Sequence, residues 1–202
     1  KGLGHAFLGE IESYASDNDF DFTGSSFGCN YDLLKFWFNS KYQLGRLGFN
    51  KDKASGEYSA LVLKATSCNR EESSNQQFLE ELSVNFYGVF SELLADEFSE
   101  LDGKLLWLIL NKQPIEELAE LNEQQVSDVE DFALGFRQYS ACLYGLKLWL
   151  LHQSVKGFNA DFPIIASKVL QKKSIKTICE QHGLTGKKAF NEALIRFVKM
   201  HD

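Results

Sequence analysis

The sequence predicts an α/β unit followed by an all-helical region. The alternation of apolar and polar residues that is typical of strands occurs only within residues 20–65, where it surrounds a short helical pattern. After the polar stretch 68–77, only helical periodicity is present. Because a strand-bearing segment followed by helices alone cannot place both parts in one sheet, we expect two domains, 1–67 and 78–202, joined by a linker at 68–77.

The composition is that of a folded chain with a sizeable core. Hydrophobic residues make up 44% and aromatic residues 13% of the 202 positions. The longest apolar run, Leu105–Leu110, is too short to span a bilayer, and no signal peptide is visible. The cysteines form no C-x-x-C pair, so we expect neither a zinc site nor a disulfide framework, but reduced thiols of a cytoplasmic protein. They are Cys29, Cys68, Cys142 and Cys179.

The net charge of −7 conceals a strong asymmetry. Residues 71–131 carry sixteen acidic residues and two lysines, whereas residues 168–202 carry eight basic and three acidic residues. A basic block on an acidic body is a candidate footprint for a polyanion, and a solvated helix face is the alternative interpretation.

The chain opens with a glycine loop that runs into a helix. Gly2 and Gly4 precede a helical pattern over residues 5–16. The first N–H groups of a helix have no partner within it, and glycines let a phosphate approach them, so an anion site is one interpretation of the pattern. The alternative is a plain turn, which explains a Gly-x-Gly in most sequences. Since nothing precedes the loop to hold it, we expect the chain to be a piece of a longer polypeptide.

The strand segment starts at Phe20–Thr23. Gly24 and Gly28 bracket Ser25–Phe27, and we expect the end of the strand to twist away from its neighbour there. A splayed strand exposes backbone donors and acceptors with which an extended ligand can pair.

A helix and a hairpin complete this unit. Asn30 is a good N-cap for a helix over residues 31–40. Strands are expected over residues 42–49 and 58–65, and the polar turn 50–56 between them favours an antiparallel hairpin.

The end of the chain predicts two helices, residues 174–181 and 185–199. Cys179 and Gly183 imitate the spacing of a helix-turn-helix, although Glu192 stands where that motif requires an apolar residue. The second helix of such a motif would present Lys187, Lys188, Asn191 and Arg196.

The order of the expected elements and several short motifs resemble those of a known enzyme family. The sequence of glycine loop, helix, strand, helix, strand, strand is similar to the second half of a GCN5-related N-acetyltransferase, the GNAT fold. Several segments resemble, in the same order, the bacterial tRNA(Met) cytidine acetyltransferases. They are Ser26-Phe27-Gly28, Leu34-x-Phe36-Trp37, Arg46-Leu47-Gly48, Ala54-Ser55-Gly56-x-Tyr58-Ser59-Ala60 and Leu184-x-Gly186-Lys187-Lys188.

The resemblance implies the C-terminal half of a GNAT domain followed by a helical tail that contacts tRNA. In that family an ATP-hydrolysing RecA-like module and the first half of the acetyltransferase domain come earlier in the protein. The implied reaction is acetyl transfer from acetyl-CoA to N4 of the anticodon wobble cytidine of elongator tRNA(Met). ATP would be used by the missing module, and the piece alone is expected to be inactive.

The resemblance also assigns cofactor residues. The segment Lys1, Gly2, Leu3, Gly4 and His5 stands over the second half of the family's pyrophosphate-holding segment. Asn39 stands where the family can carry an arginine that reaches the cofactor. The sequence assigns no catalytic residue, because the strand that usually supplies one would precede Lys1; His5 and Tyr31 are the nearest candidates.

The basic block suggests where RNA would be contacted. Lysines contact phosphates without reading sequence. The expected RNA-binding residues are Lys172, Lys173, Lys176, Lys187 and Lys188. Two rival interpretations stay open: a nucleic-acid-binding regulator with a C-terminal helix-turn-helix and an α/β sensing or dimerisation domain, and a helical interaction module without a ligand.

Overall fold

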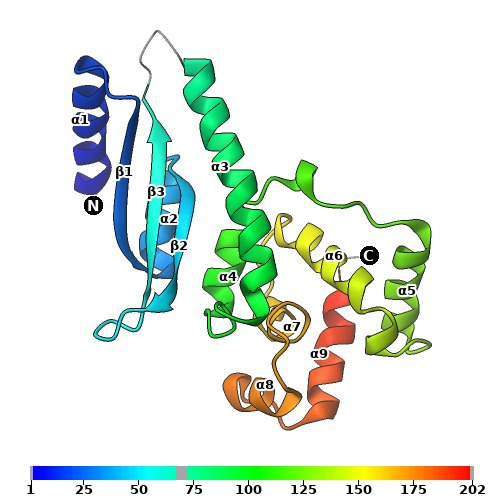
Figure 1. The fold of residues 1–202 in the computed structure, drawn as a ribbon. Helices are drawn as coiled ribbons and strands as arrows, with labels where there is room; N and C mark the ends of the chain where they lie inside the picture. Colours follow the sequence, from blue (N-terminus) through cyan, green and yellow to red (C-terminus); the bar gives the residue numbers. More distant parts are fainter. Residues whose placement is uncertain (1, 67–71, 201–202) are drawn as a thin grey trace. The chain divides into compact units, whose positions relative to one another are not determined.

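The computed structural model describes residues 2–66 and 72–200 (Figure 1). The chain divides into two compact units, Lys1–Gly88 and Val89–Asp202. As predicted, strands are confined to the first unit, and the described part of the second unit is helical.

The first unit is built on a three-stranded antiparallel sheet of order β1-β3-β2. Its β2–β3 hairpin is confirmed, and β3 is paired on both sides. The elements are α1 (Leu3–Asp17), β1 (Phe22–Cys29), α2 (Tyr31–Asn39), β2 (Gln43–Lys51), β3 (Tyr58–Ala65) and the first part of α3 (Glu72–Glu92).

Helices lie on both faces of this sheet. On one face, the Lys64 ammonium lies 2.8 Å from a carboxylate oxygen of Glu12 in α1 and 5.7 Å from the ring centroid of Tyr42, which follows α2. On the opposite face, a Cβ built on Gly45 would lie 3.0 Å from a methyl carbon of Leu82 in α3. The Asn30 side chain accepts a hydrogen bond from Leu33 N at 3.0 Å, which confirms the predicted cap of α2.

The strand expected to splay does not do so. β1 pairs with β3 at every position, from Phe22 opposite Ala65 to Cys29 opposite Tyr58. The prediction was wrong because its glycines serve close packing between paired strands: a Cβ on Gly24 would lie 2.7 Å from a Leu63 methyl carbon and 2.8 Å from the Val62 carbonyl oxygen.

The expected linker is helical where it is described. Residues 67–71, with Cys68, lie outside the described part of the chain, but α3 already begins at Glu72. Polar composition misled the prediction, because these side chains stabilise a helix through pairs one turn apart. The amides of Gln76 and Gln77 donate to Glu80 at 3.1 Å and Glu81 at 2.9 Å.

The second unit packs its helices around α7. That helix contacts α4, α6, α8 and α9, and Phe162, Ile165, Ala166 and Val169 on it are buried. The elements after α3 are η1 (Leu93–Ala95), α4 (Gly103–Leu110), η2 (Ile115–Glu117), α5 (Glu123–Leu134), η3 (Tyr139–Ala141), α6 (Leu143–Ser154), α7 (Phe162–Val169), α8 (Ile175–His182) and α9 (Lys187–Lys199). The two helices predicted at the end of the chain are α8 and α9.

The described cysteines are free. Cys29 and Cys142 are buried and Cys179 is half-buried, which agrees with the prediction that the cysteines belong mostly to the core. Among the described residues no cluster of His, Cys, Asp and Glu could hold a metal ion. None of the described helices combines the length and the apolar character needed to cross a membrane.

Candidate cofactor and nucleic-acid sites

The first turn of α1 presents unpaired backbone donors. Gly2, the N-cap, has φ 111°, a left-handed conformation that favours glycine, and no side chain caps the helix. The first bond into the helix runs from Ala6 N to the Gly2 carbonyl at 3.1 Å. The N–H groups of Leu3, Gly4 and His5 therefore have no acceptor within the described residues, and no acidic residue occupies this turn. Such a turn attracts an anion.

Phe36 of α2 packs against this turn. Its ring centroid lies 4.8 Å from that of His5, and a Cβ on Gly4 would lie 3.3 Å from two of its ring carbons. Asn39 is exposed one turn further along α2, on the side that Phe36 shares. The structure thus brings Gly4 and His5 to Phe36 and sets Asn39 one helical turn away, while Lys1 lies outside the described residues.

A cavity of about 360 Å³ adjoins the turn, between α1, β1 and α2. Most of its lining is apolar, contributed by Phe7, Leu8 and Ile11 of α1 and Phe36 and Trp37 of α2; Gly4, Thr23, Gly24, Ser25 and Tyr42 complete it. The indole Nε1 of Trp37 is buried and has no hydrogen-bond partner among the described residues. The cavity therefore offers mostly apolar walls, with the Trp37 Nε1 buried behind its own ring.

Two hydroxyl groups in the lining pair with each other. The oxygens of Thr23 and Tyr42 lie 3.0 Å apart. Burial raises the pKa of Tyr42, so its phenol stays a neutral hydroxyl. The sequence motifs include Phe36-Trp37 but point to neither Thr23 nor Tyr42. The alternation of β1, once its register is known, places Thr23 on the face shared with α1.

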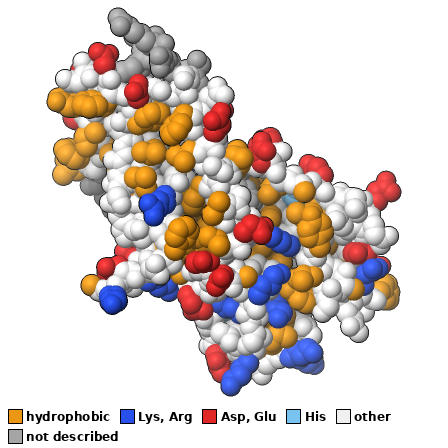
Figure 2. Space-filling model, in the orientation of Figure 1, with side chains coloured by type: hydrophobic (Ala, Val, Ile, Leu, Met, Phe, Trp, Pro, Cys, Tyr) orange, Lys and Arg blue, Asp and Glu red, His pale blue; other side chains and the backbone are white. Residues whose placement is uncertain are grey.

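Part of the apolar surface of α1 is uncovered. Leu3, Phe7 and Tyr14 are 85%, 65% and 64% exposed, whereas Leu8 and Ala15 are buried. Figure 2 shows hydrophobic side chains gathered where Figure 1 draws α1. The outer edge of β1 also pairs with no strand of the described residues.

The nearest candidates for a catalytic group have ordinary surroundings. His5 is exposed against Phe36, and Tyr31 begins α2 with the Lys35 ammonium 5.6 Å from its ring centroid. Nothing in the described geometry singles out either side chain as a base or an acid.

The lysines expected to contact RNA differ in availability. Lys176 and Lys188 are 85% and 93% exposed in their side chains, with a carboxylate 4.0 Å from each ammonium. The side chain of Lys173 is only 9% exposed, and its ammonium donates to Gln181 at 3.1 Å. Lys172 donates to the Val169 carbonyl at 2.6 Å.

Lys187 and Asn191 line a cavity of the helical unit. Of the other residues that a helix-turn-helix would present, Arg196 is held by Asp161: its Nε and Nη2 each lie 2.8 Å from a carboxylate oxygen. A groove-reading surface on α9 would therefore lack its arginine.

Known proteins are similar in sequence to both units of this chain. Residues 6–67 match the family model described as GNAT acetyltransferase 2. This range runs from Ala6 in α1 past the end of β3, so it includes most of the lining of the adjoining cavity but not the first-turn residues Leu3, Gly4 and His5.

Three relatives are similar over nearly the whole chain. A tRNA(Met) cytidine acetyltransferase of Vibrio cholerae is 28% identical over 96% of this chain and 25% of the relative. The proteins of the same description from Nitrosococcus halophilus and Thermofilum pendens are 29% and 26% identical over 98% and 92% of this chain, and 27% and 23% of the relatives. The chain thus spans about a quarter of the length of these relatives.

Proposed function

Because the chain is homologous to about a quarter of the tRNA(Met) cytidine acetyltransferases, we propose that it forms part of an enzyme that acetylates a cytidine of tRNA(Met) with acetyl-CoA. The proposed acceptor is N4 of the wobble cytidine of the elongator tRNA(Met) anticodon. ATP hydrolysis belongs, in this proposal, to a module outside the chain.

The observation that carries the proposal is the first turn of α1 beside the cavity of α1, β1 and α2. Acetyl-CoA would place its diphosphate at the N–H groups of Leu3, Gly4 and His5, where the helix dipole favours negative charge. Its methylene and amide arm fits a cavity whose walls are mostly apolar. When bound, the cofactor supplies the activated acetyl group.

The site also has to orient the cytosine amine toward the acetyl group of the cofactor. The exocyclic amine of cytosine is a weak nucleophile because its lone pair is delocalised into the ring, so it has to be held against the thioester while its proton is removed. A base stacked in a folded anticodon also has to be turned out, which gives ATP-driven remodelling a purpose.

The helical unit is proposed to hold the tRNA. Lys176, Lys187 and Lys188 have ammonium groups accessible for phosphate contacts, which position RNA without specifying sequence. Lys172 and Lys173, whose ammonium groups donate within the protein, would contribute chiefly to the local potential.

Upstream parts of the full-length protein are proposed to cover α1. Leu3, Phe7 and Tyr14 and the outer edge of β1 are apolar and backbone surfaces of the kind buried between halves of one domain. The first half of the acetyltransferase domain is the proposed occupant.

The test is acetyl transfer by the full-length protein, measured as labelled acetyl incorporated into elongator tRNA(Met). We expect incorporation into the wobble cytidine; no incorporation with ATP and acetyl-CoA present would overturn the proposal. Trp37→Phe should raise the KM for acetyl-CoA severalfold, because the indole forms part of the cavity wall and a smaller ring leaves a gap beside the cofactor arm.

A matched control is present in the helical unit. Trp107 also buries an indole Nε1 without a partner among the described residues. Trp107→Phe should leave the KM for acetyl-CoA unchanged. Equal effects of the two substitutions would remove Trp37 from the cofactor site.

A further inference from the structure

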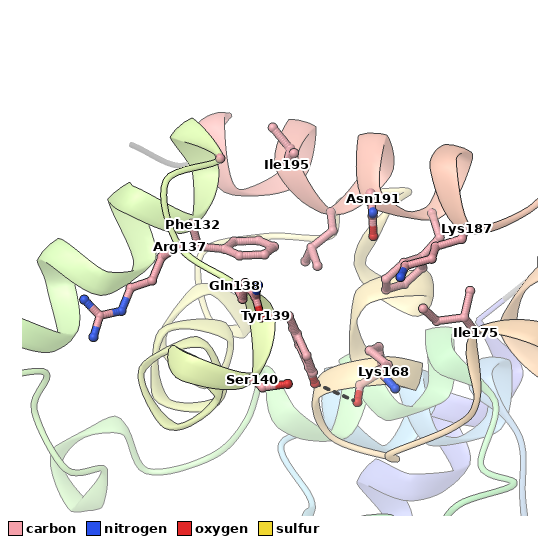
Figure 3. Close-up of a pocket in the computed structure, with 13 residues that line it drawn as sticks. Phe132, Arg137, Gln138, Tyr139, Ser140, Lys168, Ile175, Lys187, Asn191 and Ile195 are labelled. Carbon is pink, nitrogen blue, oxygen red and sulfur yellow. Dashed lines mark hydrogen bonds between the residues drawn. The ribbon is translucent and has the colours of Figure 1, made fainter.

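A second cavity, of about 600 Å³, opens within the helical unit (Figure 3). The end of α5, the segment around η3, α7 and α9 all contribute to its lining. Its volume lies within the range of about 300 to 1,000 Å³ that is typical of small-molecule sites. No Asp or Glu is among the described residues that line it.

Several polar groups of the lining are unused by the protein. Lys187 and Asn191 stand one turn apart on α9, and Figure 3 shows the Asn191 amide directed from the helix toward the cavity. Ser140 lies across from them. The side chains of these three residues make no hydrogen bond or ion pair with the described part of the chain, so they are available to a ligand.

Aromatic rings supply the rest of the recognition surface. The Tyr139 hydroxyl donates to the Lys168 carbonyl oxygen at 3.3 Å, and the Lys168 ammonium lies 5.6 Å from the Tyr139 ring centroid. These two contacts fix the ring. In Figure 3 the Phe132 ring also points into the cavity.

Two lysines, Lys168 and Lys187, line the cavity, and the Lys168 ammonium also donates to the Lys173 carbonyl oxygen at 3.2 Å. Burial lowers the pKa of Lys172, and the neighbouring ammonium groups of Lys147 and Lys168 lower it further. The Lys147 ammonium lies 3.8 Å from a carboxylate oxygen of Glu92, and the Glu92 side chain is 78% exposed. Arg137, in contrast, is turned away from the cavity and lies 3.0 Å from Asp128. Because Lys168 and Lys187 line the cavity and no carboxylate does, an anion is the favoured ligand charge.

We propose that this cavity binds one nucleotide of a single-stranded RNA segment, with its phosphate at Lys168 and Lys187 and its base between the aromatic rings and Asn191. The inference rests on the proposed function, since it names the part of the RNA substrate that the helical unit holds. Two exposed lysines come next to lining residues in the sequence: Lys176 follows Ile175, and Lys188 follows Lys187. They would contact the neighbouring phosphates of the strand.

A single strand is favoured over a duplex for a geometric reason. Only an unstacked base can enter a cavity and offer its face to a ring and its edge to an amide, whereas a duplex presents backbone and grooves. Lysines on a flat surface would hold either form.

The experiment measures binding of fluorescent oligocytidylate and of an RNA duplex of equal length by the full-length protein without acetyl-CoA. Lys187→Ala should weaken binding of the single strand and lower its salt slope by about 0.7, the loss of one phosphate contact. Asn191→Ala should weaken it severalfold with an unchanged salt slope, because the amide carries no charge. The matched control, Lys199→Ala, removes the same charge from the other end of α9 and should change the affinity less than twofold.

The outcomes separate the two proposals. Selective loss of single-strand binding in Lys187→Ala and Asn191→Ala supports the nucleotide site. Unchanged binding in both variants, or equal loss for the duplex and the single strand, would overturn it while leaving acetyl transfer untouched. If RNA binding depends on Lys187 and Asn191 but the full-length protein transfers no acetyl group, the nucleotide site stands and only the proposed reaction is overturned.

Discussion

The Phe36 ring of α2 packs over Gly4 in the first turn of α1, so closely that a Cβ at Gly4 would lie 3.3 Å from two ring carbons. The ring must give way for any side chain at this position, and it borders both the unpaired N–H groups and the cavity beside them. We therefore expect Gly4→Val to raise the KM for acetyl-CoA in the full-length enzyme.

The same helix provides a control. A Cβ added at Gly9 would meet no atom within 4 Å, so Gly9→Ala should stabilise α1 by about 0.5 to 1 kcal/mol through helix propensity. Urea denaturation checks the stability and acetyl-CoA titration checks the site. If Gly9→Ala raised the KM for acetyl-CoA as much as Gly4→Val does, the rise in KM would not come from the contact between Gly4 and Phe36.

Gly103 is predicted to respond in the opposite direction. It begins α4 against the start of α7, and a Cβ there would lie 2.5 Å from Pro163 Cβ and 2.8 Å from Pro163 Cα. Because a proline backbone cannot move aside as a flexible side chain does, Gly103→Ala should cost about 1 to 3 kcal/mol of unfolding free energy. A melting temperature equal to that of the unsubstituted chain would contradict this close approach.

Gln171 is predicted to be a stabilising polar residue of the helical core. Its buried amide donates to the carbonyl oxygens of Phe98 at 3.1 Å and Leu101 at 2.8 Å, and its oxygen accepts from Ser167 at 3.3 Å. Gln171→Leu removes the side-chain donor from the Leu101 carbonyl and from the Phe98 carbonyl, which still accepts from Leu101 N at 3.0 Å, and should lower the free energy of unfolding by about 1 to 3 kcal/mol. Denaturant titration measures the loss, with Gln138→Leu at an exposed position as the control; equal stabilities would refute it.

His182 is predicted to make the stability pH-dependent. Burial lowers its pKa below 6.5 and nearby Lys173 lowers it further, against an opposing effect of Asp102. The folded state then binds fewer protons than the unfolded state between the two pKa values. Its contribution is complete above about pH 6.5 and declines as the pH falls toward the folded pKa.

The measurement compares His182→Gln with the unsubstituted chain. The difference in unfolding free energy between pH 7.5 and pH 5 should shrink in the variant. His152→Gln, on α6, is the control for loss of another histidine. A variant whose stability falls as steeply as that of the unsubstituted chain over this range would rule out His182 as the source.

Local sequence patterns predicted most of the elements. The strand expected at 58–65 is β3, the Asn30 cap begins α2, and the last two helices begin within two residues of their predicted starts. These features depend on neighbours a few residues apart, which the sequence contains.

The failures involve partners distant in the chain. The local pattern around Gly24 predicts splaying, but the missing side chain of this residue accommodates Leu63, about forty residues later. The polar composition of residues 72–77 predicts a linker, although Asn75 donates to Asp21 at 3.2 Å and lies at the start of a long helix.

Composition and periodicity are local properties, and they predicted the strand-bearing part, the helical part after it and the basic end of the chain. The anion site at α1 stays a prediction. Which donors remain open to a ligand depends on contacts that form only when the chain folds. Folding ties Arg196 to Asp161 and Lys173 to Gln181, and it leaves Lys187 and Asn191 without partners in the described residues. The physical reason is that a polar side chain is available for binding only where packing brings it no partner, and packing joins residues that the sequence keeps far apart.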